Sequence, residues 1–222
     1  MTPDTQFSPD TQFSKARIEM LCDGIFAIAM TLLVLELKVP DLPKGTPSVE
    51  LWHAIAEHRL GFFAFALSFM LAGQFWLQHH VFFHYLAHAT RAMALLNLVF
   101  LMFVSLLPFS TSLFARFGSQ QVGVTFYFGN QFILALLLAA QWALAGRQGL
   151  LRGDAKDPKR RRFAALVVAF PIMFGLVFFA ALVRPEYGGL VVFPGIIAIL
   201  VIRRRVEKRA IAEAHMREPR DE

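Results

Sequence analysis

Long apolar runs separated by short polar stretches dominate the chain. They lie near residues 18–39, 60–83, 92–115, 122–145, 163–183 and 188–202. About 20 apolar residues in a helix cross the roughly 30 Å of hydrocarbon in a bilayer. The first five runs reach that length, whereas the sixth is short and holds Gly188, Gly189 and Pro194. The pattern predicts an all-α integral membrane protein with six transmembrane helices.

The polar stretches divide the chain into a membrane domain and two tails. Residues 1–14 contain the hexad PDTQFS twice in tandem, which is typical of a disordered tail. We expect the six-helix domain to cover residues 15–202 and a basic cytoplasmic tail to cover 203–222. Between the first two spans, residues 52–59 are expected to form a short interfacial helix.

Composition supports a membrane protein and argues against an enzyme. The 222 residues are 56% apolar, with 24 Phe, and the mean hydropathy is +0.52. Cys22 is the single cysteine, which excludes an intrachain disulfide and a cysteine-based metal cluster. The sequence contains no Gly-rich phosphate loop, and no Ser–His–Asp arrangement is suggested within the spans. We therefore expect no catalytic site and no bound cofactor or metal.

The basic residues are distributed asymmetrically about the six spans. With both termini in the cytoplasm, 17 of the 22 Lys and Arg lie inside; the five outside are Lys38, Lys44, Arg59, Arg116 and Arg184. Cytoplasmic loops of membrane proteins carry such an excess. The net charge of +6 is then explained by anionic lipid headgroups, so we expect no nucleic-acid partner.

The first span begins with three charged residues, Arg17, Glu19 and Asp23. Charge at the edge of lipid is expensive and is usually paired. Glu19 and Asp23 share a helix face, so these like charges need partners elsewhere. The residues predict an interhelical or intersubunit polar network, with the wet end of an ordinary membrane helix as the alternative.

Beyond Asp23, the first span carries a stripe at helical spacing: Gly24, Ile28, Thr31 and Leu35. At about 100° per residue, Ile28 and Leu35 lie about 20° apart on the helix surface. The span carries no charge from Gly24 to Leu35. A helix with one distinct stripe and a charged N-terminal end is a candidate to line a pore.

The second span ends in a cluster of histidines behind Trp76, namely His79, His80, His84 and His88. His80, His84 and His88 are spaced to share one helix face, and imidazoles at i,i+4 can bind a metal. The alternatives are a hydrogen-bonded helix end and a pH-sensitive inner mouth.

The third span contains Asn97 and, further on, Pro108 within LLPFSTSL. An amide inside lipid should find a partner on a neighbouring helix. Pro108 frees the carbonyl of Val104, and Ser105 or Ser112 could satisfy the backbone around the resulting kink. An ordinary kinked packing helix explains these residues equally well.

Arg17, then Cys22-Asp23-Gly24, then FAIAMTLLVLEL resembles the signature of the transmembrane protein 175 family of endolysosomal potassium channels. The Trp76–His79–His80 cluster and Asn97 with LLPFSTSL also fit, so the motifs cover roughly residues 15–115. The usual pattern has Phe-Ser-Asp where this chain has Leu21-Cys22-Asp23.

The resemblance implies a homotetramer in which helix 1 of each six-helix subunit lines a central pore. Ile28 would form the constriction, and Thr31 and Leu35 the next pore-facing layers. Below the constriction, a polar network would join residues of the first three spans: Arg17, Asp23, Trp76, His79 or His80, and Asn97.

The expected function is that of a potassium-permeable cation channel in a bacterial inner membrane, with a hydrophobic constriction and only modest preference for potassium over sodium. A ring of aliphatic side chains can exclude a hydrated ion or gate by dewetting. A secondary transporter, a membrane scaffold and a metalloprotein built on His80, His84 and His88 remain as alternatives.

Overall fold

The computed structural model of the protein describes residues 14–184. The sixth predicted span and nearly all of both predicted tails lie outside the described residues. Within 14–184 the fold is all-α, apart from isolated bridge residues such as the pair Leu86 and Leu151, and five helical segments are long and apolar enough to cross a membrane. These five match the first five predicted spans.

The elements follow one another along the chain with short connections. They are α1 (Lys15–Leu32), the 3-10 helix η1 (Leu33–Glu36), α2 (Ser48–Glu57), α3 (Arg59–Tyr85), α4 (Arg91–Ser105), α5 (Leu107–Phe117), α6 (Gln121–Arg147) and α7 (Pro158–Val183).

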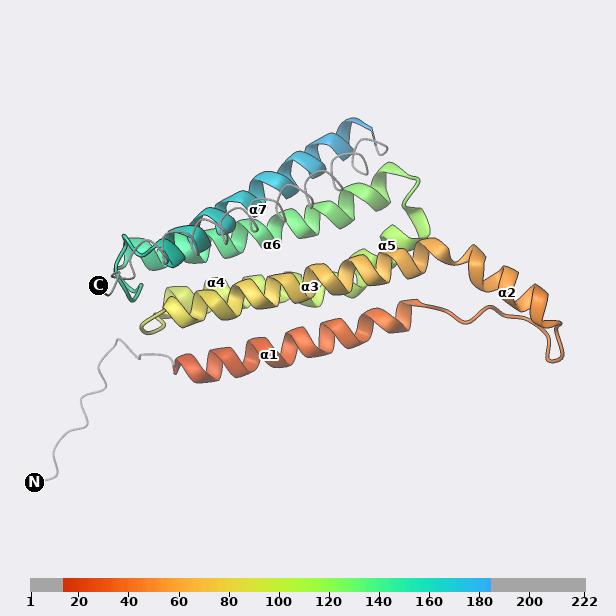
Figure 1. Cartoon of the computed structure of the whole chain (residues 1–222), viewed down its shortest axis with the longest axis horizontal. Helices are drawn as coiled ribbons and strands as arrows, with labels where there is room; N and C mark the ends of the chain where they lie inside the picture. Colours follow the sequence, from red (N-terminus) through yellow and green to blue (C-terminus); the bar gives the residue numbers. More distant parts are fainter. Residues whose placement is uncertain (1–13, 185–222) are drawn as a thin grey trace, which may run out of the picture.

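The long helices run side by side in layers (Figure 1). Helix α1 lies along one edge and packs on α3 and α4, and α6 and α7 form the opposite edge. Helices α3, α4 and α5 lie between these two edges. Helix α2 projects beyond one end of the bundle and buries none of its side chains.

Two predicted boundaries differ from those observed. The first span is α-helical only to Leu32 and then tightens into the 3-10 turn of η1. The short helix before the second span begins at Ser48 rather than at residue 52, and it ends at Glu57. It begins earlier because Pro47 occupies the N-cap, where a missing N–H breaks no helical hydrogen bond.

The third span is broken at Leu106, between α4 and α5, as Pro108 predicts. Proline removes one backbone donor and clashes with the preceding turn. Ser105 Oγ donates to the carbonyl of Leu101 at 3.0 Å, and Asn130 Nδ2 of α6 approaches the carbonyl of Phe103 at 3.4 Å. Polar side chains thus bond to backbone carbonyls around the break.

The ends of α3 and α6 are tied together by their loops. Helix α6 ends in a Schellman motif, with Gly149 at φ +67° and a bond from Leu150 N to Ala145 O of 2.9 Å. Ala87 N then donates to Leu150 O at 2.8 Å, and Arg152 N donates to Tyr85 O at 2.7 Å. This pairing draws the chain after Tyr85 into an extended conformation.

The extended chain after Tyr85 corrects the predicted histidine row. Helix α3 ends at Tyr85, so His88 lies in the loop and not on the face that carries His80 and His84. The three histidines are all exposed. Among residues 14–184, no group of three or more His, Cys, Asp or Glu side chains is placed to hold a metal ion.

Candidate functional site

Helix α1 has one face buried in the helical bundle. Its buried residues recur at helical spacing, and η1 continues the row: Ile18, Cys22, Phe26, Ala29 and Leu33. This face packs against α3 and α4. Burial of one apolar stripe is what fixes an amphipathic helix to its neighbours, so it also determines which stripe points away from the bundle.

The predicted stripe lies on the opposite side of α1. Ile28 is 60% exposed and Leu35 is 69% exposed, and Gly24 and Thr31 are also exposed. At 100° per residue, Ile28 is roughly 120° and Thr31 roughly 180° from Cys22. A Cβ added to Gly24 would meet nothing within 4 Å. The described part of the chain therefore leaves this stripe uncovered.

The hydroxyl of Thr31 gives the stripe a polar group with a fixed orientation. Its hydroxyl lies 3.0 Å from the carbonyl of Ala27 and 2.9 Å from that of Ile28, and donates back to the helix. A hydroxyl has one proton and two lone pairs. With the proton directed at the backbone, the acceptor side of the oxygen is left for a ligand on the exposed stripe.

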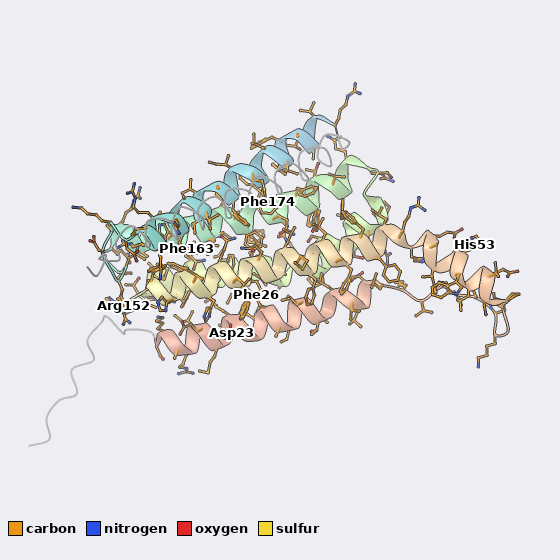
Figure 2. All side chains as sticks on the ribbon, in the orientation of Figure 1. Asp23, Phe26, His53, Arg152, Phe163 and Phe174 are labelled. Atoms are coloured by element: carbon orange, nitrogen blue, oxygen red, sulfur yellow. The ribbon has the colours of Figure 1, made fainter. Side chains whose placement is uncertain are left out.

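Asp23 is held in the N-terminal half of α1 by a bond to α3. Trp76 Nε1 donates to Asp23 Oδ1 at 2.8 Å, and the carboxylate remains exposed. The Trp76 ring lies against that of His80, with centroids 5.9 Å apart. Figure 2 shows Asp23 one turn from Phe26, which points from α1 toward α3.

Behind Asp23, a buried triad joins α1, α3 and α4. His79 Nε2 donates to Asn97 Oδ1 at 2.8 Å, and Asn97 Nδ2 donates to Cys22 Sγ at 3.2 Å. The three side chains are 3%, 1% and 1% exposed for His79, Asn97 and Cys22. Since an amide oxygen only accepts, His79 carries its proton on Nε2 in this arrangement.

The imidazole of His79 is enclosed by aromatic rings. Phe83 stacks on it with centroids 4.4 Å apart, and Phe100 of α4 is 5.4 Å away with the ring planes 10° apart. Phe26 of α1 adds a tilted contact. Three helices thus fix both the plane and the hydrogen bond of this ring.

The structure brings together most of the predicted polar residues, with two differences at the start of α1. Glu19 pairs with Lys15 in its own helix at 3.9 Å, and Lys15 Nζ also donates to Leu86 O at 3.1 Å. The side chain of Arg17 is exposed and makes no hydrogen bond or ion pair within residues 14–184. Glu19 has this intrahelical partner because Lys15 lies one turn before it.

Comparison with known proteins identifies the family of this chain. The profile of the family described as "Endosomal/lysosomal potassium channel TMEM175" matches residues 17–108. A potassium channel of Streptomyces collinus is 36% identical over 176 residues, which are 74% of this chain and 83% of the relative. The chain belongs to the TMEM175 family. The match of residues 17–108 covers the candidate stripe and the whole triad.

Other relatives in the TMEM175 family differ in the fraction of this chain, and of their own length, that the match covers. A potassium channel of Chamaesiphon minutus is 32% identical over 73% of this chain and 86% of its own length. The crystal structure of a TMEM175 homologue from the same organism superimposes with a TM-score of 0.69, at 26% identity, over 86% of this chain and 97% of that one. The human relative, described as an endosomal/lysosomal proton channel, is 42% identical over 46% of this chain but only 22% of its own length.

Sequence reasoning missed two features of this TMEM175 chain. Cys22 stood out only as a departure from the family motif, yet its sulfur accepts a bond inside the triad; its place one turn after Ile18 on the apolar face was the available signal. A second buried network joins Ser68, Thr111 and Tyr127, with oxygen–oxygen distances of 2.8 and 2.9 Å.

Proposed function

We propose that the chain forms a potassium-permeable channel in which α1 helices of several copies line the pore and Ile28 forms the constriction. The observation that carries the proposal is the uncovered stripe of α1, opposite the face that packs in the subunit. Relatives that share most of this chain are named potassium channels.

The exposed carboxylate of Asp23 argues against a lipid-facing α1. It is the ninth residue of the span that begins at Lys15, or roughly 12 Å along the helix at 1.5 Å per residue. One bond from Trp76 leaves most of its acceptor capacity unmet. Since charge inside a bilayer faces a bundle interior or water, this side of α1 is expected to face a lumen or a neighbouring copy.

Ile28 and Thr31 suit successive layers of such a lumen. A ring of isoleucine side chains admits an ion only at the cost of shedding water, or closes by dewetting. Thr31 lies about one turn further on and offers the acceptor side of its hydroxyl. A site of this kind discriminates by dehydration cost, so we expect only modest preference for potassium over sodium.

The proposed orientation places the N-terminal end of α1 in the cytoplasm. Lys15 bonds to the loop after α3, and Thr90 of that loop bonds to Gln148 after α6, so these regions share one end of the bundle. The basic residues of the α6–α7 connection gather at the same end. Positive charge on the cytoplasmic side is the rule for inner-membrane proteins.

Potassium flux from liposomes tests the constriction. Replacing Ile28 by Asn removes the apolar ring and supplies polar groups, so flux should rise several-fold and potassium should lose its advantage over sodium. Purified wild-type and Ile28→Asn protein would be reconstituted at equal density, with flux followed by a potassium-sensitive dye.

Ile172 of α7 provides a matched control, because it is also 60% exposed and lies far from the stripe. Ile28→Ala should raise flux, and Ile172→Ala should leave it unchanged. Equal flux and selectivity in all four proteins would remove Ile28 from the pore. Saturable, gradient-coupled uptake in place of passive flux would favour a transporter.

A further inference from the structure

Positive charge is concentrated where α6 passes into α7, in residues 147–162, here called the α6–α7 connection. It holds seven Lys and Arg against two Asp, a net charge of +5. The seven are Arg147, Arg152, Lys156, Lys159, Arg160, Arg161 and Arg162. Within residues 14–184, none of them makes an ion pair. Uncompensated charge of this density attracts a negatively charged partner.

The two aspartates of the connection bond to its own backbone. Asp154 Oδ1 accepts from Lys156 N at 2.9 Å, and Asp157 Oδ1 accepts from Lys159 N at 2.9 Å, at the N-cap of α7. Neither carboxylate lies within 4 Å of a basic head group in the described part of the chain. The acids therefore shape the connection and leave its basic side chains available.

Two guanidinium groups of the connection are held in place by backbone carbonyls. Arg160 Nη1 donates to Gly153 O at 2.8 Å. Arg152, the residue before Gly153, donates through Nη2 to Ala87 O at 3.1 Å. A guanidinium has five N–H donors, so each retains most of them for another acceptor. Because Arg160 bonds to the residue next to Arg152, both arginines belong to the same turn.

This turn is fixed against α3 and α1 by the fold itself. Arg152 N donates to Tyr85 O at 2.7 Å, and the neighbouring Leu86 O accepts from Lys15 Nζ of α1 at 3.1 Å. Figure 2 shows Arg152 at this end of the bundle, beyond Phe163. A site whose donors are already positioned loses less conformational entropy when a ligand binds.

The length of α7 places the turn at the depth of lipid headgroups. Its 26 residues extend about 39 Å at 1.5 Å per residue. The hydrocarbon core of a bilayer is about 30 Å thick, and about 40–45 Å with the headgroup layers. From Arg161, an exposed row continues along α7 with Ala165, Val168, Ile172 and Leu176. A lipid beside α7 can contact this row with its acyl chains and the connection with its phosphate.

We propose that the α6–α7 connection binds the phosphate groups of anionic phospholipids, with Arg152 and Arg160 as its fixed anchors. Guanidinium groups bind phosphate through two parallel hydrogen bonds. The net charge of +5 favours a lipid with a net negative charge, such as phosphatidylglycerol, over zwitterionic phosphatidylcholine. Basic loops in general attract anionic lipid without regard to position, whereas this site depends on two particular side chains. The binding does not require the proposed pore.

Thermal unfolding of the full chain in detergent, with added phosphatidylglycerol or phosphatidylcholine of the same acyl chains, tests the anchors. Near saturation, phosphatidylglycerol should raise the unfolding temperature of the wild type by roughly 3–10 °C more than phosphatidylcholine does. Arg152→Gln and Arg160→Gln should each lose at least half of that difference. Each variant is compared with itself in the two lipids, so the loss of its carbonyl bond does not enter.

Arg91→Gln is the matched control. Arg91 is exposed and follows Thr90, which bonds to Gln148, so it lies at the same end of the bundle, and its side chain makes no hydrogen bond within residues 14–184. The substitution removes the same charge and should keep most of the difference. A loss equal to that of Arg152→Gln would show diffuse attraction and overturn the site.

Native mass spectrometry of the wild type gives a second measurement that needs no variant. The chain should retain more phosphatidylglycerol than phosphatidylcholine from an equal mixture. Equal retention, or equal thermal shifts from the two lipids, would overturn the proposal. The same thermal shift from inorganic phosphate in phosphatidylcholine would assign the arginines to a soluble anion and overturn it as well.

Discussion

At the scale of single residues, the triad of Cys22, Asn97 and His79 places three hydrogen-bonding side chains in the apolar interior of the bundle. Each group is almost fully buried, and Asn97 bonds to both of the others. A buried donor left without an acceptor costs more than a hydrogen bond contributes. The triad therefore stabilises the contact of α1 with α3 and α4 only while all three members are present.

Asn97→Leu should destabilise the subunit by about 1–3 kcal/mol, because His79 Nε2–H loses its acceptor in an apolar enclosure. Thermal unfolding in detergent, followed by tryptophan fluorescence, measures the change. His79→Phe combined with Asn97→Leu should recover much of the loss, since only the weakly polar thiol of Cys22 is then left without a partner. Wild-type stability in the single variant would show that the bond contributes nothing.

At the scale of elements, α6 and α7 approach closely through glycine. A Cβ added to Gly175 of α7 would lie 2.9 Å from Phe132 Cε2 of α6. The Phe132 ring is itself held by Phe178 and Phe179, with centroids 5.8 and 6.0 Å away. Because the ring has little room to move, a side chain at position 175 would push the helices apart. Glycine at this position allows α6 and α7 to lie as close as they do.

Gly175→Ala should therefore cost about 1–2 kcal/mol of unfolding free energy, the usual penalty for overpacking. Gly146→Ala in α6 is the control, since its nearest neighbour would be Leu151 Cδ1 at 3.8 Å. That variant should be neutral or slightly more stable, as alanine favours a helix. Equal unfolding temperatures for Gly175→Ala and Gly146→Ala would contradict the close packing.

At the scale of the whole molecule, α1 is packed on one side and left uncovered on the other. The helix lies at the edge of the bundle with its apolar stripe and Asp23 uncovered by the described residues. Cyclic symmetry would point every copy of this stripe at one axis. Under the proposed function, association would use the same exposed stripe that makes α1 the candidate pore helix.

Native mass spectrometry of protein released from detergent should show an assembly of four times the 25.0 kDa chain mass. Four copies is the number implied by the family resemblance. A charge substitution on the stripe, Leu35→Glu, should shift the distribution toward smaller species, while the same change at the exposed Leu176 of α7 should not. A monomer that still conducts potassium would contradict the shared pore.

Much of the fold could be predicted from local pattern, whereas the site could be predicted only in part. The break at Pro108 and the face of α1 that carries Ile28 follow from backbone chemistry and helical spacing. His88 was misplaced because a loop pairing, which is not local, ends α3 at Tyr85. The pairing of Glu19 with Lys15 was missed although it is local, because the interpretation required partners on another helix.

The sequence by itself determined an all-α membrane protein, the positions of five spans, and a distinct stripe along the first, because hydrophobic length and periodicity are properties of the chain. Only the tertiary structure decided which stripe is buried and that Cys22, His79 and Asn97 meet. Those contacts join residues far apart in sequence, and their geometry depends on how the helices pack and not on the pattern within any one of them.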